Sequence, residues 1–127
     1  MKENVVSWFE IPVLDMDRAK AFYEEVFQFT ITVHDLGNLI MGWFPQPKEG
    51  AYGTTGSLVL NKEYQPSATD GPLIYFNSQS GDISDELSRV VEAGGKILRE
   101  KTLISEESGY MAVIIDTEGN RIALYCR

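Results

Sequence analysis

The stretch EIPVLDMDRAKAFYEEVF, residues 10–27, joins the end of a strand to a complete amphipathic helix. Asp15 stands where a helix N-cap belongs, and Asp17 follows in the first turn, where a negative charge stabilises the positive end of the helix dipole. Apolar side chains then recur at helical spacing, at Met16, Ala19, Phe22, Tyr23 and Val26. We therefore expect a strand within residues 5–13 and a helix over residues 16–27.

The same order of elements occurs twice along the chain. Three apolar segments after this helix are typical of strands, namely FTITVH (29–34), NLIMGWF (38–44) and GSLVLN (56–61). The second half repeats the pattern with a strand PLIYFNS (72–78), a helix over residues 83–93, and the strands KILRE (96–100), YMAVIID (110–116) and NRIALYC (120–126). Each half is therefore predicted to be a βαβββ module, over residues 5–61 and 72–126, with NKEYQPSATDG as the linker.

This repeat predicts an α+β fold in which one helix covers one face of a four-stranded sheet in each module. The side chains expected to point toward the helices are Ile11, Ile74, Phe76, Ile122 and Leu124. The other face of each sheet is then free, and we expect the two curved sheets to meet edge to edge so that their free faces line a cleft. Alternation along the strands puts Trp8 and Glu10 on the free face of the first module and Tyr75 at the matching place in the second.

Composition limits the classes of partner. With 127 residues, of which 43% are apolar, the chain is expected to form one domain over residues 1–127. Its 11 basic and 19 acidic residues give a net charge of −8 without a basic cluster, which argues against nucleic acid and anionic membranes. Cys126 is the only cysteine and no signal-peptide pattern opens the sequence, so we expect a cytoplasmic protein with a small-molecule ligand.

Three segments in a fixed order carry a resemblance to a known family. They are EIPVLDMDRAKAFYEEVF, EAGGKIL (92–98) and DTEGNRIAL (116–124). With them the chain resembles the glyoxalase/bleomycin-resistance/dioxygenase (vicinal oxygen chelate) superfamily over nearly its whole length. The resemblance implies two βαβββ modules that form a cleft, and a homodimer, since members often pair modules across chains. One departure is Gln28, where the first helix of the family usually stops at glycine, so a different exit turn is expected.

The resemblance also implies where a metal ion would bind. Metal-dependent members hold a divalent ion on the concave face through four side chains, usually His and Glu, and these positions correspond here to Trp8, Val59, Leu73 and Ala123. Indole and alkyl groups supply no donor atom to a divalent ion. We therefore expect no metal and no cofactor. The residues expected to line a ligand-binding cleft instead are Trp8, Glu10, Val59, Leu73, Tyr75 and Ala123.

Glu10 has two interpretations. It lies mid-strand among apolar residues, where a carboxylate is costly unless it is paired or used. Arg121 is expected on the same face of the closing strand, so a structural salt bridge between them is one interpretation, and contact with a ligand or acid–base chemistry is the other. His34, the only histidine, is expected near a strand end with a surface or structural role.

Different classes of function remain open at this point. The favoured one is a metal-free binder of a small, mostly apolar molecule that carries a donor or a positive charge. An alternative is a superfamily enzyme, a lyase, isomerase or dioxygenase, whose metal ligands lie elsewhere. A third is a metal-free enzyme in which Glu10 is the base.

Overall fold

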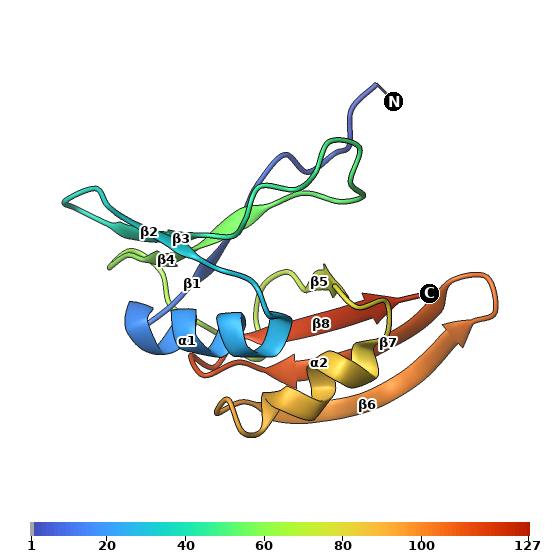
Figure 1. Cartoon of the computed structure of the whole chain (residues 1–127). Helices are drawn as coiled ribbons and strands as arrows, with labels where there is room; N and C mark the ends of the chain where they lie inside the picture. Colours follow the sequence, from blue (N-terminus) through green and yellow to red (C-terminus); the bar gives the residue numbers. More distant parts are fainter. Residues whose placement is uncertain (1) are drawn as a thin grey trace.

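The computed structural model describes residues 2–127 and contains two βαβββ modules, as the repeat predicts (Figure 1). The first module consists of β1 (Phe9–Pro12), α1 (Met16–Phe27), β2 (Thr32–Asp35), β3 (Ile40–Trp43) and β4 (Gly56–Leu60). The second consists of β5 (Ile74–Asn77), α2 (Ile83–Val90), β6 (Lys96–Ser105), β7 (Gly109–Ile115) and β8 (Arg121–Cys126). The α+β class and the order of elements are thus confirmed. None of the helices in the described part of the chain is both long and apolar enough to cross a membrane.

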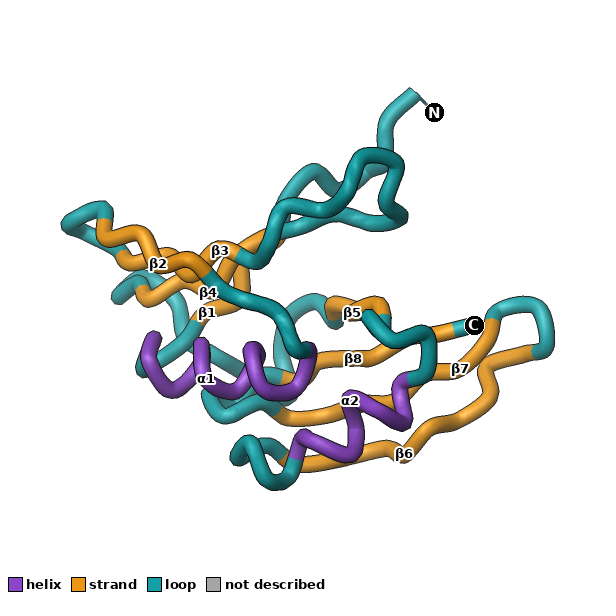
Figure 2. The backbone as a smooth tube through the Cα atoms, viewed as in Figure 1, coloured by secondary structure: helices purple, strands orange, loops and turns teal. Residues whose placement is uncertain are grey.

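Each module builds its own four-stranded sheet. The strand orders are β1-β4-β3-β2 and β5-β8-β7-β6, so the last strand of each module inserts beside the first (Figure 2). That one pair is parallel in each sheet, and the other pairs are antiparallel. A parallel pair requires a long crossover connection, which in each module consists of the helix and the two middle strands.

Helix α1 begins and ends on specific side chains. Asp15 is extended and accepts a hydrogen bond from the Arg18 backbone N–H at 3.1 Å, as expected of an N-cap. At the other end Gln28 adopts the left-handed conformation, with φ 59° and ψ 47°, and its side-chain amide donates to the Glu25 carbonyl. The expectation of a different exit turn is therefore wrong, because Gln28 adopts the conformation that glycine usually provides at this place.

Helix α2 is shorter than its sequence pattern suggests. It ends at Val90, whereas the prediction ran to residue 93. Residues 91–94 continue as turns, because the N–H of Gly95 bonds to the Val90 carbonyl and the N–H of Gly94 to the Val91 carbonyl. Gly94, with φ 103°, makes this closing turn without a Cβ clash.

Two strands differ in length from their predictions. β1 begins at Phe9, so only the second part of residues 5–13 is strand. β6 runs on to Ser105, five residues past the predicted end at 100, and its pairing with β7 is interrupted by register shifts. It is an edge strand that lies largely exposed, so its last residues carry no core periodicity from which a strand could be predicted.

The helix-covered faces of both sheets share one core. In Figure 1 the two helices lie side by side, with β2, β3 and β4 above α1 and β6 below α2. The ring of Phe76 from β5 lies 5.7 Å from that of Phe9, 5.5 Å from that of Phe44 and 4.9 Å from that of Phe27, measured between centroids. Aromatic contacts at these distances join the two modules through their inner faces.

This packing corrects the predicted arrangement of the cleft. Ile11 and Leu58 of the first sheet lie in the same core cluster as Ile122 and Leu124 of the second. The faces turned toward each other within one chain are therefore the helix-covered ones, and no strand of one sheet pairs with a strand of the other in the described residues. The free faces lie on the outer sides of the two sheets.

A polar turn between β7 and β8 also ties the modules together. The Tyr23 hydroxyl of α1 donates to Asp116 at 2.6 Å, and the Asn120 side chain donates to the Pro12 carbonyl at 2.8 Å. Burial, followed by the charge of Asp116 and the hydrogen bond to it, raises the pKa of Tyr23 well above its usual value. These bonds connect the turn to both β1 and α1.

Candidate functional site

Strand register defines the first outer face, the side of β1–β4 away from the helices. Glu10 is paired with Ser57, and Ser57 with Trp43, while Pro12, Val59, Met41 and His34 form the next row. The residues of this face used below are Trp8, Glu10, Met41, Trp43, Val59 and His34. Side chains of paired residues lie on the same face, and Trp8, which precedes β1, joins this surface through its contacts with Glu10 and Trp43.

Glu10 is held between two ring donors. The indole N–H of Trp8 donates to Oε2 at 3.4 Å, and the hydroxyl of Tyr64 donates to Oε1 at 3.1 Å. Burial, assisted by the hydrogen bond and negative charge of Glu10, raises the pKa of Tyr64 to about 12. Each carboxylate oxygen therefore has a donor, and Tyr64 keeps its proton in this setting.

Trp43 extends the aromatic surface beside Trp8. The two indole rings meet edge to face with centroids 5.9 Å apart, and the His34 ring lies 4.2 Å from Trp43 on the neighbouring strand. Trp43 is 37% exposed, so part of its ring remains open to solvent. Neither Trp43 nor Tyr64 is singled out by the sequence as a site residue.

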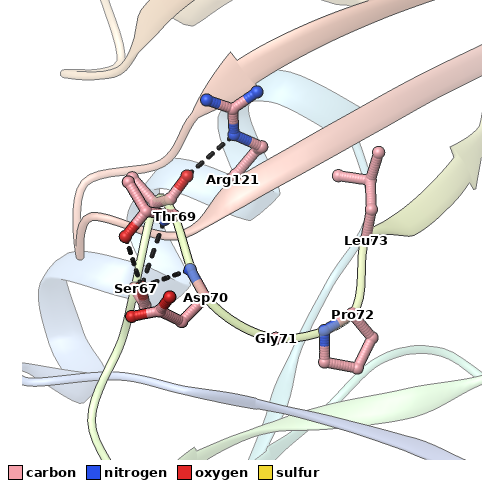
Figure 3. A pocket seen from close by; sticks show the side chains of 8 residues that line it. Ser67, Thr69, Asp70, Gly71, Pro72, Leu73 and Arg121 are labelled. Atoms are coloured by element: carbon pink, nitrogen blue, oxygen red, sulfur yellow. Dashed lines mark hydrogen bonds between the residues drawn. The ribbon is translucent and has the colours of Figure 1, made fainter.

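Arg121 does not pair with Glu10. Its Nε donates to the Ala68 carbonyl at 2.8 Å in the linker between modules (Figure 3). Glu10 bonds to Trp8 and Tyr64 instead. The predicted salt bridge is therefore wrong within one chain, because the two outer faces point away from each other. Arg121 and Leu73 line a hollow of about 40 Å³ formed with residues 67–72, which is small for an organic ligand.

The second outer face belongs to β5–β8. Tyr75 is paired with Ala123, and Ala123 with Val113, so these three side chains lie in one row. Tyr75 is 51% exposed, whereas Ala123 is buried beneath its neighbours. Leu73, two residues before Tyr75, is also open to solvent. This face is aromatic and aliphatic, as the alternation of the strands predicts.

The six predicted site residues thus fall into two groups. Trp8, Glu10 and Val59 lie on the first outer face, and Leu73, Tyr75 and Ala123 lie on or next to the second. Val59 and Ala123 are buried yet lie outside the shared core cluster, consistent with their position on outer faces. Among residues 2–127 no hydrogen bond or ring contact joins one group to the other.

The chemistry of the implied metal positions does not fit a metal ion. Trp8 offers a protonated indole nitrogen that already donates to Glu10, while Val59, Leu73 and Ala123 offer only alkyl groups. Zinc, iron and manganese sites are built from imidazole, thiolate and carboxylate donors. In the described part of the chain no three His, Cys, Asp or Glu side chains gather in a way that could hold an ion.

A larger hollow of about 370 Å³ lies where β5 and β8 end. Tyr52 from the loop before β4 forms one side, and Asn77, Tyr125 and Arg127 form much of the rest. The guanidinium of Arg127 lies over the Tyr52 ring, 5.9 Å from its centroid. None of the six predicted site residues lines this hollow.

Residues 5–124 match the model of the Glyoxalase/Bleomycin resistance protein/Dioxygenase superfamily. The chain belongs to this superfamily. The match covers the first module, the linker and nearly all of the second module, so family membership rests on almost the whole sequence and not on one motif. No curated protein sequence matches the chain significantly.

Solved structures of the superfamily share this fold. TnmS3, an antibiotic binding protein from Streptomyces sp. CB03234, is 26% identical with a TM-score of 0.66, and the match covers 99% of this chain and 98% of that one. The genomically encoded fosfomycin resistance protein FosX from Listeria monocytogenes is 16% identical with a TM-score of 0.67, over 100% and 93% of the two chains. Glyoxalase I from Zea mays is 18% identical with a TM-score of 0.68, over 94% of this chain, which spans only 44% of the maize protein.

Proposed function

We propose that this protein binds a small, mostly apolar molecule in a cleft that contains no metal ion. The observation that carries this proposal is the first outer face, where Trp8 binds the Glu10 carboxylate and packs against Trp43, and no set of metal ligands is present among the described residues. Apolar walls with a few fixed polar groups are typical of sites for small organic molecules. The proposal agrees with the description of TnmS3 as an antibiotic binding protein.

The proposed cleft is formed by two copies of the chain. In one chain the two outer faces point to opposite sides, so neither can complete a cleft with the other. Placing the first outer face of one copy against the second outer face of its partner would bring Trp8 and Glu10 of one copy near Tyr75 of the other. Exposed aromatic side chains on both faces favour such an interface, because they gain free energy when they leave water. A symmetric homodimer would contain two such clefts.

A dye titration tests the proposal. Nile red, a neutral apolar dye that fluoresces in dry sites, is added to the purified protein and to the Trp8→Ala and Tyr75→Ala variants. We expect each variant to bind the dye about tenfold more weakly, because each loses a ring that lines the cleft. Val91→Ala is the matched control, since Val91 is also an exposed apolar residue but follows α2 on the helix side of the second sheet.

Two results would contradict the proposal. One is equal dye binding by the wild type and both cleft variants, and the other is an effect of Val91→Ala as large as theirs. Mass spectrometry of small molecules released from the purified protein supplements the titration. A molecule that is retained by the wild type and lost from Trp8→Ala would identify the ligand.

A further inference from the structure

We propose that the ligand is a planar organic cation, whose charge pairs with Glu10 while its ring lies against Trp8 and Trp43. This inference rests on the proposed function, because it specifies the class of molecule bound in the same cleft. Three independent features of the first outer face support it: a carboxylate without a cationic partner, an open aromatic surface, and a linker residue that fixes the carboxylate.

Glu10 has no positive partner in the described residues. The salt bridges there join Arg18 to Glu118, Lys20 to Glu24 and Lys101 to Asp82, and Arg121 is engaged with the linker carbonyl of Ala68. The two donors of Glu10, the Trp8 indole and the Tyr64 hydroxyl, are both neutral. The negative charge on this face is therefore uncompensated and available to a cation.

The aromatic rings next to Glu10 favour the same class of ligand. The face of an indole carries negative electrostatic potential, so a cation gains energy above it, and Trp is the strongest such partner. Trp8 and Trp43 meet edge to face at 5.9 Å, so their ring planes form a corner, and Trp8 is the ring that also binds the carboxylate. A flat aromatic ring with a positive nitrogen can both stack on the indole rings and pair with the Glu10 carboxylate.

Tyr64 is the positioning residue of this arrangement. It comes from the linker between modules, and its hydroxyl donates to Oε1 of Glu10 at 3.1 Å while Trp8 donates to Oε2. Two donors on different oxygens fix the orientation of the carboxylate and lower the entropy lost when it meets a charged group. The raised pKa of Tyr64, about 12, keeps this donor protonated over the whole physiological range.

The net charge of the protein also favours a cationic ligand. The net charge is −8, so the protein as a whole attracts cations and repels anions. Both the local carboxylate and the overall charge therefore select against an anionic ligand. The electrostatic part of the binding should weaken as salt concentration rises.

The test compares two probes of nearly equal shape, N-methylquinolinium and neutral quinoline, by quenching of tryptophan fluorescence. We expect the wild type to bind the cation about tenfold more tightly than quinoline at low salt, and Glu10→Gln to abolish that preference by weakening the cation far more than quinoline. Tyr64→Phe should reduce the preference partly, again by weakening the cation more than quinoline. Glu63→Gln is the matched control, because it removes an exposed charge next to Tyr64 without touching Glu10.

The outcomes separate this inference from the proposed function. Equal binding of the two probes, or a preference that survives Glu10→Gln, would overturn the assignment of a cationic ligand. Failure of both probes where Nile red binds in a Trp8-dependent way would also overturn it, while the proposed apolar cleft would stand. If Nile red binding is itself indifferent to Trp8 and Tyr75, the proposed function fails.

Discussion

Tyr64 is a linker residue whose acid–base behaviour depends on a strand residue far away in sequence. Burial and the bond to Glu10 raise its pKa from 10.0 to about 12. The folded state holds the Tyr64 proton more tightly than the unfolded chain, so the protonated Tyr64 stabilises the fold. This stabilisation is complete below pH 10 and is lost as pH rises through about 12.

Ultraviolet titration of tyrosinate provides the check. The difference between the wild type and Tyr64→Phe should titrate with a midpoint near 12. Changing Glu10 to Gln should lower the midpoint only in part, because burial, the largest cause of the raised pKa, remains. A midpoint near the usual tyrosine value in both proteins would mean that the contact between Tyr64 and Glu10 does not form in solution.

Glu118 concentrates several interactions on one buried carboxylate. It accepts bonds from the backbone N–H groups of Leu14 and Asp15, both at 2.8 Å, and from the Arg18 side chain at 2.7 Å. Burial by itself would raise the pKa of Glu118, but the bond from Arg18 and the two backbone bonds hold it below its usual value of 4.5. The carboxylate thus anchors the start of α1 to the turn between β7 and β8.

Glu118→Gln should lower the free energy of unfolding by about 2 kcal/mol at neutral pH. The loss is no larger because Arg18 is half exposed, so solvent screens its ion pair with Glu118. A lowered carboxyl pKa stabilises the fold above 4.5 and loses that effect as pH falls through the folded value. Urea denaturation at several pH values should therefore show a difference in the free energy of unfolding between wild type and variant that becomes smaller at acidic pH. A difference that stays constant with pH would contradict the assigned role.

At this scale the sequence predicted part of the site and missed part of it. Alternation over residues 5–13 was enough to place Trp8 next to Glu10, although Trp8 lies just before β1. Tyr64 could not be predicted, because its contact with Glu10 spans 54 residues and begins in a loop without periodicity. The interpretation of Glu10 as a salt-bridge partner of Arg121 was wrong for a related reason, because the sequence does not show how the two sheets face each other.

The residue that ends helix α1, Gln28, has a strained backbone conformation. Gln28 has φ 59°, a left-handed conformation that costs a residue with a Cβ about 1 kcal/mol relative to glycine. Gln28→Gly should therefore raise the free energy of unfolding by about 0.5 kcal/mol, the gain being reduced by the lost bond from its side chain to the Glu25 carbonyl. Thermal and urea melts measure this change, and Gln28→Ala, which keeps the strain and loses the side-chain bond, should be less stable than the wild type. Destabilisation by glycine would show that the side-chain bond outweighs the backbone strain.

Elements with caps and core periodicity were predicted well. The bounds of α1 agree with the prediction because Asp15 and the apolar spacing both specify them. β6 was predicted five residues short, since its second part is an exposed edge that packs against no core. The end of α2 differs for a third reason: the pair Gly94–Gly95 closes the helix through hydrogen bonds that no longer follow the α-helical spacing.

The whole molecule is expected to function without a metal ion. An ion that binds only the folded state must raise the melting temperature, and the alkyl and indole groups at the implied ligand positions provide no such site. We therefore expect no stoichiometric metal in the purified protein and no thermal shift with zinc, nickel, manganese or iron. A reproducible rise in melting temperature with one of these ions, removed by a single outer-face substitution, would contradict this expectation.

The architecture of the molecule was predictable, but the relation between its sheets was not. Two repeats of strand, helix and three strands were sufficient to indicate the fold. The contacts of Phe76 with Phe9 and Phe44, which turn the inner faces toward each other, depend on packing between modules. Hydrophobic periodicity identifies which face of a strand is buried and does not specify the surface that covers it.

Mixing of two inactive variants tests the central claim most directly. Trp8→Ala damages the first outer face and Tyr75→Ala the second, so homodimers of either variant should bind Nile red poorly. After subunit exchange, a mixed dimer would combine both damaged faces in one cleft and two intact faces in the other. We predict that mixing equal amounts, with dimers verified by sedimentation, restores tight binding to about a quarter of the sites. Verified exchange without any recovery of tight dye binding would contradict a cleft shared between two chains.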